Sequence, residues 1–174
     1  MRLLFLTFLL VFEFVHVNLN AQEKSIKIIN TEWATCNLDA EKPSDYGSVF
    51  TWEDALKACP EGWRLPTKTE IDNLMICYKG EGMLNGVEGF WFNENGEEQN
   101  RLFFPIGGFI EPSSNSIKYQ KICGAYWSWT YYNFVGFSPF HYILTNTKSK
   151  DFGDYEDNHQ NYKFAVRCVK GTYF

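Results

Sequence analysis

Histidine is the side chain most often used for acid–base catalysis, and it is scarce in this chain. Beyond residue 21 only His141 and His159 are present, and neither lies in a G-x-S-x-G or H-E-x-x-H motif. His141 stands between two aromatic residues, where a packed or hydrogen-bonded role is favoured over a catalytic one. The histidines therefore indicate no familiar type of hydrolase.

Carboxylate pairs offer a second route to catalysis, because glycosidases cleave their substrates with two acidic side chains. Glu97 with Glu98, and Asp154 with Glu156, are pairs of this kind. Acidic residues in loops are usually only solvated, so we expect no catalytic residue and no enzyme activity. A secreted hydrolase that acts on glycans through such carboxylates is the alternative.

Aromatic side chains are the main candidates for ligand contact, since nine of the seventeen residues from Tyr126 to Tyr142 are Tyr, Trp or Phe. Alternation along one strand face cannot bury all of them, so we expect some to be exposed. Tyrosine gives a large contact area at small entropic cost, and exposed rings also stack on sugar faces. The candidate ligand-contacting residues are Trp129, Tyr131, Tyr132, Asn133, Phe137, His141, Asp151, Asp154 and Tyr155. In the competing interpretation, Trp127 and Trp129 lie in the core and the Phe residues fill a loop-rich domain.

Two short helices with a tight joint between them are predicted ahead of this aromatic region. Thr51 is a plausible N-cap for the first helix, which a Pro/Gly-rich stretch at 60–62 ends. Thr67 and Glu70 form a capping box for the second helix, which we expect to end at Lys79–Gly80. Both helices carry apolar residues on one face, as amphipathic helices do.

Strands are predicted on both sides of the helices. The expected strands are Ser25–Asn30, Glu32–Asp39, Phe90–Phe92, Leu102–Pro105 with Gly107–Ile110 following it after a turn or bulge, and Lys163–Lys170. Apart from the short strand at Phe90–Phe92, residues 81–101 are predicted to form a long loop, and Asn95–Gly96 is a pair typical of a hairpin turn. The fold class is therefore α+β with a large loop-rich half.

The first 21 residues have the pattern of a signal peptide: a short basic start, an apolar run and small residues at Leu19–Ala21. Polar residues interrupt the apolar run too early for the alternative, an uncleaved membrane anchor. We expect cleavage after Ala21, which leaves residues 22–174 as a single exported domain, periplasmic, cell-surface or secreted. No second apolar run predicts a membrane span in the mature chain.

Charge and cysteine content exclude other classes of function. The formal net charge is -5 and no basic tract is present, so nucleic-acid binding is not expected. The five cysteines include no C-x-x-C motif for zinc or redox chemistry. Because five is odd, at least one thiol must stay free or pair outside the chain.

A family resemblance rests on three segments of the sequence. They are Trp33–Leu38, the stretch from Tyr46 to Thr67 that ends in Cys-Pro-Glu-Gly-Trp-Arg-Leu-Pro-Thr, and Tyr126–Thr130 together with Val166–Lys170. Together they resemble the Fibrobacter succinogenes major paralogous domain, a family of exported bacterial domains similar to C-type lectin-like folds, over roughly residues 26–170. The resemblance implies two helices packed on a small twisted antiparallel sheet, paired N- and C-terminal strands, and a long loop region that carries any binding.

The resemblance also bears on the cysteines. It implies a disulfide between Cys59 and Cys168. For the remaining three, we weakly favour a pair between Cys77 and Cys123, with Cys36 as a buried thiol.

Calcium binding is not expected, although sugar-binding C-type lectins use it. Those proteins hold the ion with a Glu-Pro-Asn or Gln-Pro-Asp loop motif and a Trp-Asn-Asp motif. Here Glu111–Ser113 and Trp127–Trp129 depart from both, which removes ligand oxygens from a site that needs six to eight. We expect no metal and no cofactor.

These observations favour an exported, non-enzymatic C-type lectin-like binding module whose partner is a glycan or a protein. Its ligand is expected to contact the loops of residues 131–155. Besides the glycan-active hydrolase, a structural or adhesin subunit that assembles through a free cysteine or exposed aromatic residues remains a third interpretation.

Overall fold

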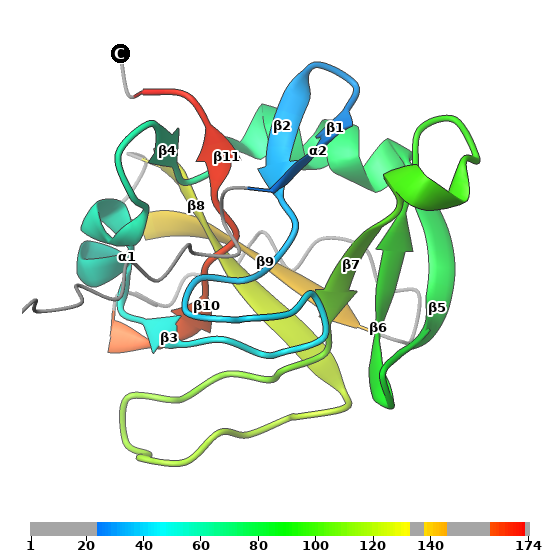
Figure 1. Cartoon of the computed structure of the whole chain (residues 1–174). Helices are drawn as coiled ribbons and strands as arrows, with labels where there is room; N and C mark the ends of the chain where they lie inside the picture. The colour runs from blue at the N-terminus through cyan, green and yellow to red at the C-terminus, as the bar shows by residue number, and fades with distance from the viewer. Residues whose placement is uncertain (1–23, 133–137, 146–160, 173–174) are drawn as a thin grey trace, which may run out of the picture.

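The computed structural model describes residues 24–132, 138–145 and 161–172. Within them the chain forms two α-helices, three small sheets and a 3-10 turn, an α+β arrangement (Figure 1). The predicted signal peptide, residues 1–21, lies outside the described residues. None of the described helices has the length and apolar character that crossing a membrane requires.

Local hydrogen bonds set the start of both helices. α1 (Trp52–Ala58) begins after Thr51, whose hydroxyl accepts a hydrogen bond from a backbone N–H of the first turn. α2 (Lys68–Ile76) begins with a complete capping box between Thr67 and Glu70. Both predicted N-caps are confirmed.

The end of α2 differs from the prediction. The helix stops at Ile76 and not at Lys79–Gly80, because Cys77 caps it and the Cys77 carbonyl accepts the Asn93 N–H at 2.9 Å. The next residue opens β5 (Tyr78–Leu84). The apolar spacing of the helix continues to Tyr78, although the helix ends at Ile76. Spacing alone does not show this difference, because an apolar residue that packs on the core can belong to a helix or to a strand.

Residues 81–92 form a hairpin, so the prediction of a long loop there is wrong, whereas the short strand expected at Phe90–Phe92 is confirmed. β5 pairs antiparallel with β6 (Val87–Phe92), which pairs with β7 (Leu102–Pro105) through a connection that includes the 3-10 turn η2 (Glu98–Asn100). Asn85 and Gly86 close the β5–β6 hairpin with φ angles of 52° and 81°, as a type I′ turn requires. Glycine-rich strands have low intrinsic β-propensity, so only the cross-strand pairing reveals them. The strand at Leu102–Pro105 is confirmed.

A second sheet joins the two ends of the domain to the joint between the helices. Its strands are, in spatial order, β1 (Ser25–Ile28), β2 (Thr31–Ala34), β11 (Val169–Lys170) and β4 (Trp63–Arg64). Val169 pairs with Trp33 on one side and Arg64 on the other. The expected pairing of N- and C-terminal strands is confirmed, and Figure 1 shows β11 between β2 and β4.

The third sheet carries the aromatic region. Its strands, in spatial order, are β3 (Val49–Phe50), β10 (Phe164–Ala165), β8 (Cys123–Tyr132) and β9 (Ser138–Thr145). The closing segment Lys163–Lys170 is therefore not one alternating strand but two short ones, β10 and β11, in different sheets. Residues 166–168 connect the two strands and are fully buried. Their backbone can be buried because the carbonyls of Val166 and Cys168 accept hydrogen bonds from the N–H groups of Leu38 and Ala34.

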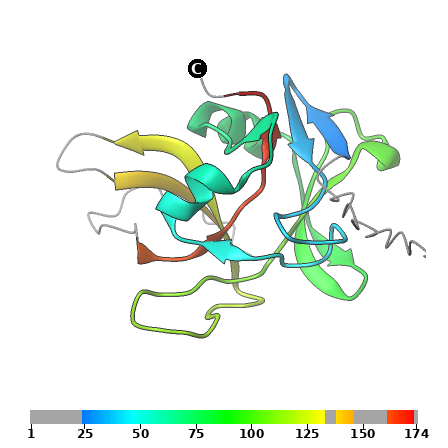
Figure 2. The same ribbon diagram turned by 60° about the vertical axis from the view of Figure 1, so that its left-hand side comes forward.

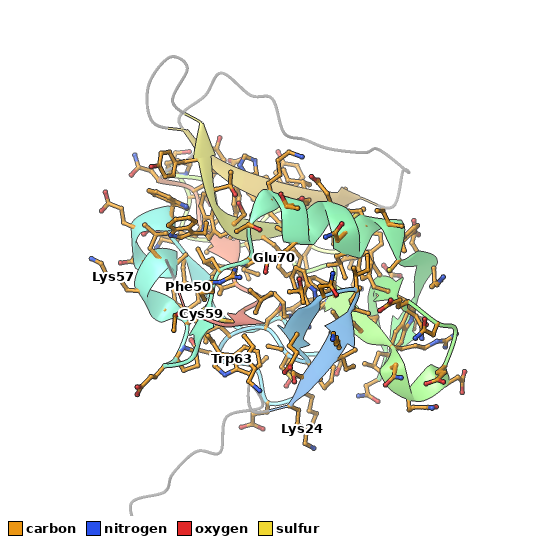
Figure 3. The ribbon with its side chains drawn as sticks, turned by 90° about the horizontal axis from the view of Figure 1, so that it is seen from above. Lys24, Phe50, Lys57, Cys59, Trp63 and Glu70 are labelled. Atoms are coloured by element: carbon orange, nitrogen blue, oxygen red, sulfur yellow. A yellow bond between two sulfur atoms is a disulfide. The ribbon has the colours of Figure 1, made fainter. Side chains whose placement is uncertain are left out.

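A disulfide joins Cys59, at the end of α1, to Cys168, as the resemblance implies. Figure 3 shows Cys59 beside Trp63 at the joint between the helices. The weakly favoured pair Cys77–Cys123 is wrong: both are buried free thiols, as is Cys36.

The two thiols do not pair because Cys77 packs in the core at the end of α2, whereas Cys123 opens β8 opposite Thr145. Burial raises the pKa of all three free thiols, that of Cys123 to about 11. They therefore stay protonated at neutral pH.

Candidate functional site

The described part of the chain contains four of the nine predicted ligand-contacting residues. Trp129 and Tyr131, near the C-terminal end of β8, are 36% and 42% exposed. Tyr132 closes β8 opposite Ser138, and His141 lies on β9. Outside the described residues lie Asn133, Phe137, Asp151, Asp154 and Tyr155.

The pairing of β8 with β9 is interrupted where its aromatic residues become exposed, and it resumes at Tyr131 opposite Pro139. The register of β8 with β9 shifts between Trp127 and Tyr131. Within this interval the Trp129 N–H donates to the Pro66 carbonyl at 2.8 Å, and the Thr130 hydroxyl accepts the Lys68 N–H at 2.9 Å. The joint between the helices thus holds the strand end that carries the exposed rings.

A buried tryptophan of α1, Trp52, also contacts this strand end. Trp52, the first residue of α1, donates its indole N–H to the Ser128 carbonyl at 3.2 Å. Its ring meets the Tyr131 ring edge-on, with centroids 6.5 Å apart. We call the exposed part of this strand end, formed by Trp129, Thr130 and Tyr131, the β8 aromatic surface.

Charged groups of the helix joint that holds this strand end are paired. Arg64 and Glu70 form two hydrogen bonds of 2.8 Å each, and Lys68 bonds Asp72 at 2.9 Å. Burial by itself would raise the pKa of the Glu70 carboxyl, but the hydrogen bonds from Arg64 and Thr67 together lower it below its usual value. Glu70 is therefore ionised at neutral pH and serves the helix cap and the ion pair.

His141 does not join the β8 aromatic surface. Its side chain is 6% exposed, and its ring lies 4.9 Å from the Phe164 ring and 5.9 Å from the Trp127 ring. The packed role that the sequence favours is confirmed. Trp127 is fully buried as well, so the two tryptophans of this strand have different roles.

Sequence reasoning missed a groove on the three-stranded sheet, because residues 81–101 were read mainly as loop. The groove has a volume of about 280 Å³ and is floored by Trp91 and Phe103, with Glu98 and Arg101 at its rim. The signal was present in Gly89-Phe90-Trp91-Phe92, where alternation sends Trp91 to the face opposite Phe90 and Phe92.

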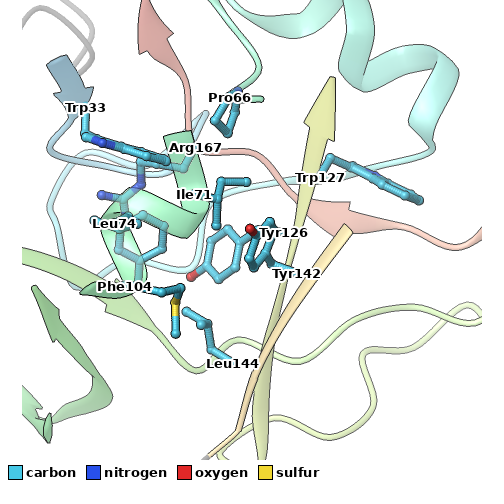
Figure 4. Close-up of a pocket in the computed structure, with 11 residues that line it drawn as sticks. Trp33, Pro66, Ile71, Leu74, Phe104, Tyr126, Trp127, Tyr142, Leu144 and Arg167 are labelled. Carbon is cyan, nitrogen blue, oxygen red and sulfur yellow. The ribbon is translucent and has the colours of Figure 1, made fainter. Parts of the chain in front are cut away.

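A cavity of about 20 Å³ inside the core is too small to hold a ligand. Figure 4 shows its lining, which includes Trp33, Phe104 and the buried Arg167. Trp33 is 1% exposed, and its indole N–H has no described acceptor. This cavity belongs to the packing of the core and not to a binding site.

Metal-binding side chains are not gathered anywhere in the described parts of the chain, where no cluster of three or more His, Cys, Asp or Glu could hold an ion. Glu111, from the loop compared with the calcium motif, instead pairs with Lys118. The described site therefore offers aromatic surface and paired charges.

Comparison with known proteins gives one match. The family model described as Fibrobacter succinogenes major domain (Fib_succ_major) matches residues 16–170. No curated protein and no solved structure matches the chain.

Proposed function

The chain belongs to the Fibrobacter succinogenes major domain family, and from that premise we propose that it is an exported, non-enzymatic binding module. In this proposal it works in the periplasm, at the cell surface or as a secreted protein. It recognises a glycan or a protein through the β8 aromatic surface and the loops that continue from it. Its fold is C-type lectin-like in the same proposal, supported by the helix pair, the meeting of β2 with β11, and the disulfide from α1 to the closing segment.

The observation that carries the proposal is the exposure of two large rings on a strand end that is firmly held. Trp129 and Tyr131 are 36% and 42% exposed, while the backbone between them is fixed by hydrogen bonds to the helix joint. Rigid Trp and Tyr side chains supply much of the binding energy at recognition surfaces, because little entropy is lost when they are covered.

The alternatives find less support in the described residues. A carboxylate-dependent hydrolase needs two acidic groups that face a substrate, whereas Glu70 and Asp72 beside this surface are engaged by Arg64 and Lys68. Assembly through a free cysteine is disfavoured because all three free thiols are buried.

Binding of the purified domain, residues 22–174, to a glycan array and to an array of bacterial surface proteins tests the proposal. We expect Trp129→Ala and Tyr131→Ala each to weaken binding to any hit by at least about tenfold, the loss typical of a central aromatic contact. Ile122→Ala is the matched control, since Ile122 is 55% exposed on a different loop. Equal binding by all four proteins would contradict the proposal, and release of cleaved oligosaccharide would favour the hydrolase.

A further inference from the structure

The groove on the three-stranded sheet is a second surface, remote from the β8 aromatic surface. In Figure 2 the end of the β8–β9 hairpin projects on one side of the molecule and β5–β7 lie on the other. The groove runs between the outer face of this sheet and a wall that includes Ile26 of β1 and Pro43. Its volume, about 280 Å³, is close to the lower end for sites that hold small ligands.

Two glycines leave room for the aromatic rings of Trp91 and Phe103 close to the strands. A Cβ atom at Gly82 would stand 2.8 Å from the Trp91 indole nitrogen, and one at Gly89 would stand 2.2 Å from the Phe103 ring. Both distances are too short for a side chain, so any other residue would push the rings off the sheet. The ring centroids of Trp91 and Phe103 are 4.8 Å apart and their planes are tilted by 55°, so the buried Phe103 ring supports the half-buried Trp91 ring, which offers the exposed apolar surface.

The rim carries one donor group and one acceptor group beside this floor. The Arg101 guanidinium lies over the Trp91 ring at 5.7 Å, and it pairs with Glu98 at 3.3 Å. These two side chains are 42% and 85% exposed. An exposed pair of this kind contributes little to stability, so both groups can turn toward a ligand at low cost.

We propose that this groove binds a neutral saccharide. Arg101 turns off the Trp91 ring to admit the apolar face of a sugar ring, which stacks on the indole. Arg101 then donates to the sugar hydroxyl groups and Glu98 accepts from them. A neutral sugar is favoured over an acidic one because Glu98 stands at the rim and the chain has a formal net charge of -5. The site does not depend on the function proposed for the β8 aromatic surface.

Titration with neutral and acidic oligosaccharides tests the inference. The probes are hexasaccharides of β-linked glucose, xylose, mannose and N-acetylglucosamine, with hexagalacturonate as the acidic comparison. Tryptophan fluorescence and heteronuclear NMR of the 22–174 domain follow the titration. We expect at least one neutral probe to bind with a Kd below about 1 mM, as a single stacked ring with few hydrogen bonds allows, and to shift the amide signals of β6 and β7.

Matched variants separate this groove from the other surface. Trp91→Ala and Arg101→Ala should weaken binding of the neutral probe by at least about tenfold, whereas Trp129→Ala should leave it unchanged. Because Trp91 is half-buried, Glu98→Gln, an exposed and isosteric change, gives a weakening that unfolding cannot explain. The inference is overturned if no neutral probe binds, if only hexagalacturonate binds, or if the groove variants bind as tightly as the unaltered domain. Loss of binding in Trp129→Ala alone would assign the saccharide to the β8 aromatic surface instead.

Discussion

Arg167 is a buried charged side chain, and we predict that its replacement strongly lowers the free energy of unfolding. It is 1% exposed, and its guanidinium lies 4.3 Å from the centre of the Phe104 ring. Its nitrogens donate to four acceptors: Asn37 Oδ1 at 2.9 Å and the carbonyls of Ala34, Thr35 and Phe103 at 3.0, 2.9 and 3.0 Å. All four acceptors are neutral, so burial lowers the pKa of Arg167, to about 10, and leaves it charged at neutral pH.

Replacing Arg167 by Met keeps the aliphatic stem but removes every donor. Each buried acceptor that loses its partner costs about 1–3 kcal/mol, and the relief from burying a charge offsets part of the sum. We therefore expect Arg167→Met to lower the free energy of unfolding by about 3–5 kcal/mol, as when one member of a buried ion pair is removed.

Arg167→Lys is the sharper test of the same reasoning. Lysine keeps the positive charge but carries its donors on one nitrogen, which cannot reach four acceptors spread over two separate segments, residues 34–37 and Phe103. The charge stays buried while most of the acceptors lose their donors, so Lys should destabilise the domain at least as much as Met.

Urea unfolding followed by tryptophan fluorescence, with the disulfide intact, measures both variants. Arg101→Met is the control, since Arg101 is exposed and should change stability by less than about 1 kcal/mol. If Arg167→Lys stays within about 1 kcal/mol of the unaltered domain, the charge and not the fork of donors is what matters, and the reasoning is refuted.

Two further predictions concern the joint between the helices. The double variant Cys59→Ala/Cys168→Ala should have a free energy of unfolding lower by about 5 kcal/mol in urea, because the disulfide closes a loop of 109 positions and so restricts the unfolded chain. A loss under about 1 kcal/mol would contradict this explanation. The folded-state pKa of Glu70 is lowered, so the stability it contributes is fully present above its ordinary value of 4.5 and is lost as pH falls through the folded-state value. Glu70→Gln should therefore have lower stability at pH 7 and a shallower loss on acidification, and parallel pH profiles of the two proteins would contradict this.

The joint could be predicted from the sequence because its determinants are local. The cap of α2 needs only Thr67 and Glu70, three residues apart, and the first helix is ended by Pro60 and Gly62. The β5–β6 hairpin has an equally local turn at Asn85–Gly86, but its glycine-rich strands gave no alternation strong enough to identify them.

Long-range contacts account for what the sequence could not reveal. The four acceptors of Arg167 lie between 64 and 133 positions away along the chain. The sequence around residue 167 therefore does not indicate that its charge is buried. In the aromatic region, composition indicated that some rings must be exposed. Which ones depends on the register shift between Trp127 and Tyr131 and on the bond from Trp129 to Pro66, which belong to the tertiary structure.

The same contacts explain how a loop-rich domain can present rigid binding surfaces. The sheet of β1, β2, β11 and β4, the disulfide and the buried arginine all tie the ends of the chain to the centre of the molecule. The β8 aromatic surface and the groove lie to either side of that centre, each on strands with their own hydrogen bonds. Exposed side chains such as Glu98 can therefore change with little effect on the core, whereas the buried Phe103 of the groove also accepts a hydrogen bond from Arg167 and so helps to hold the fold.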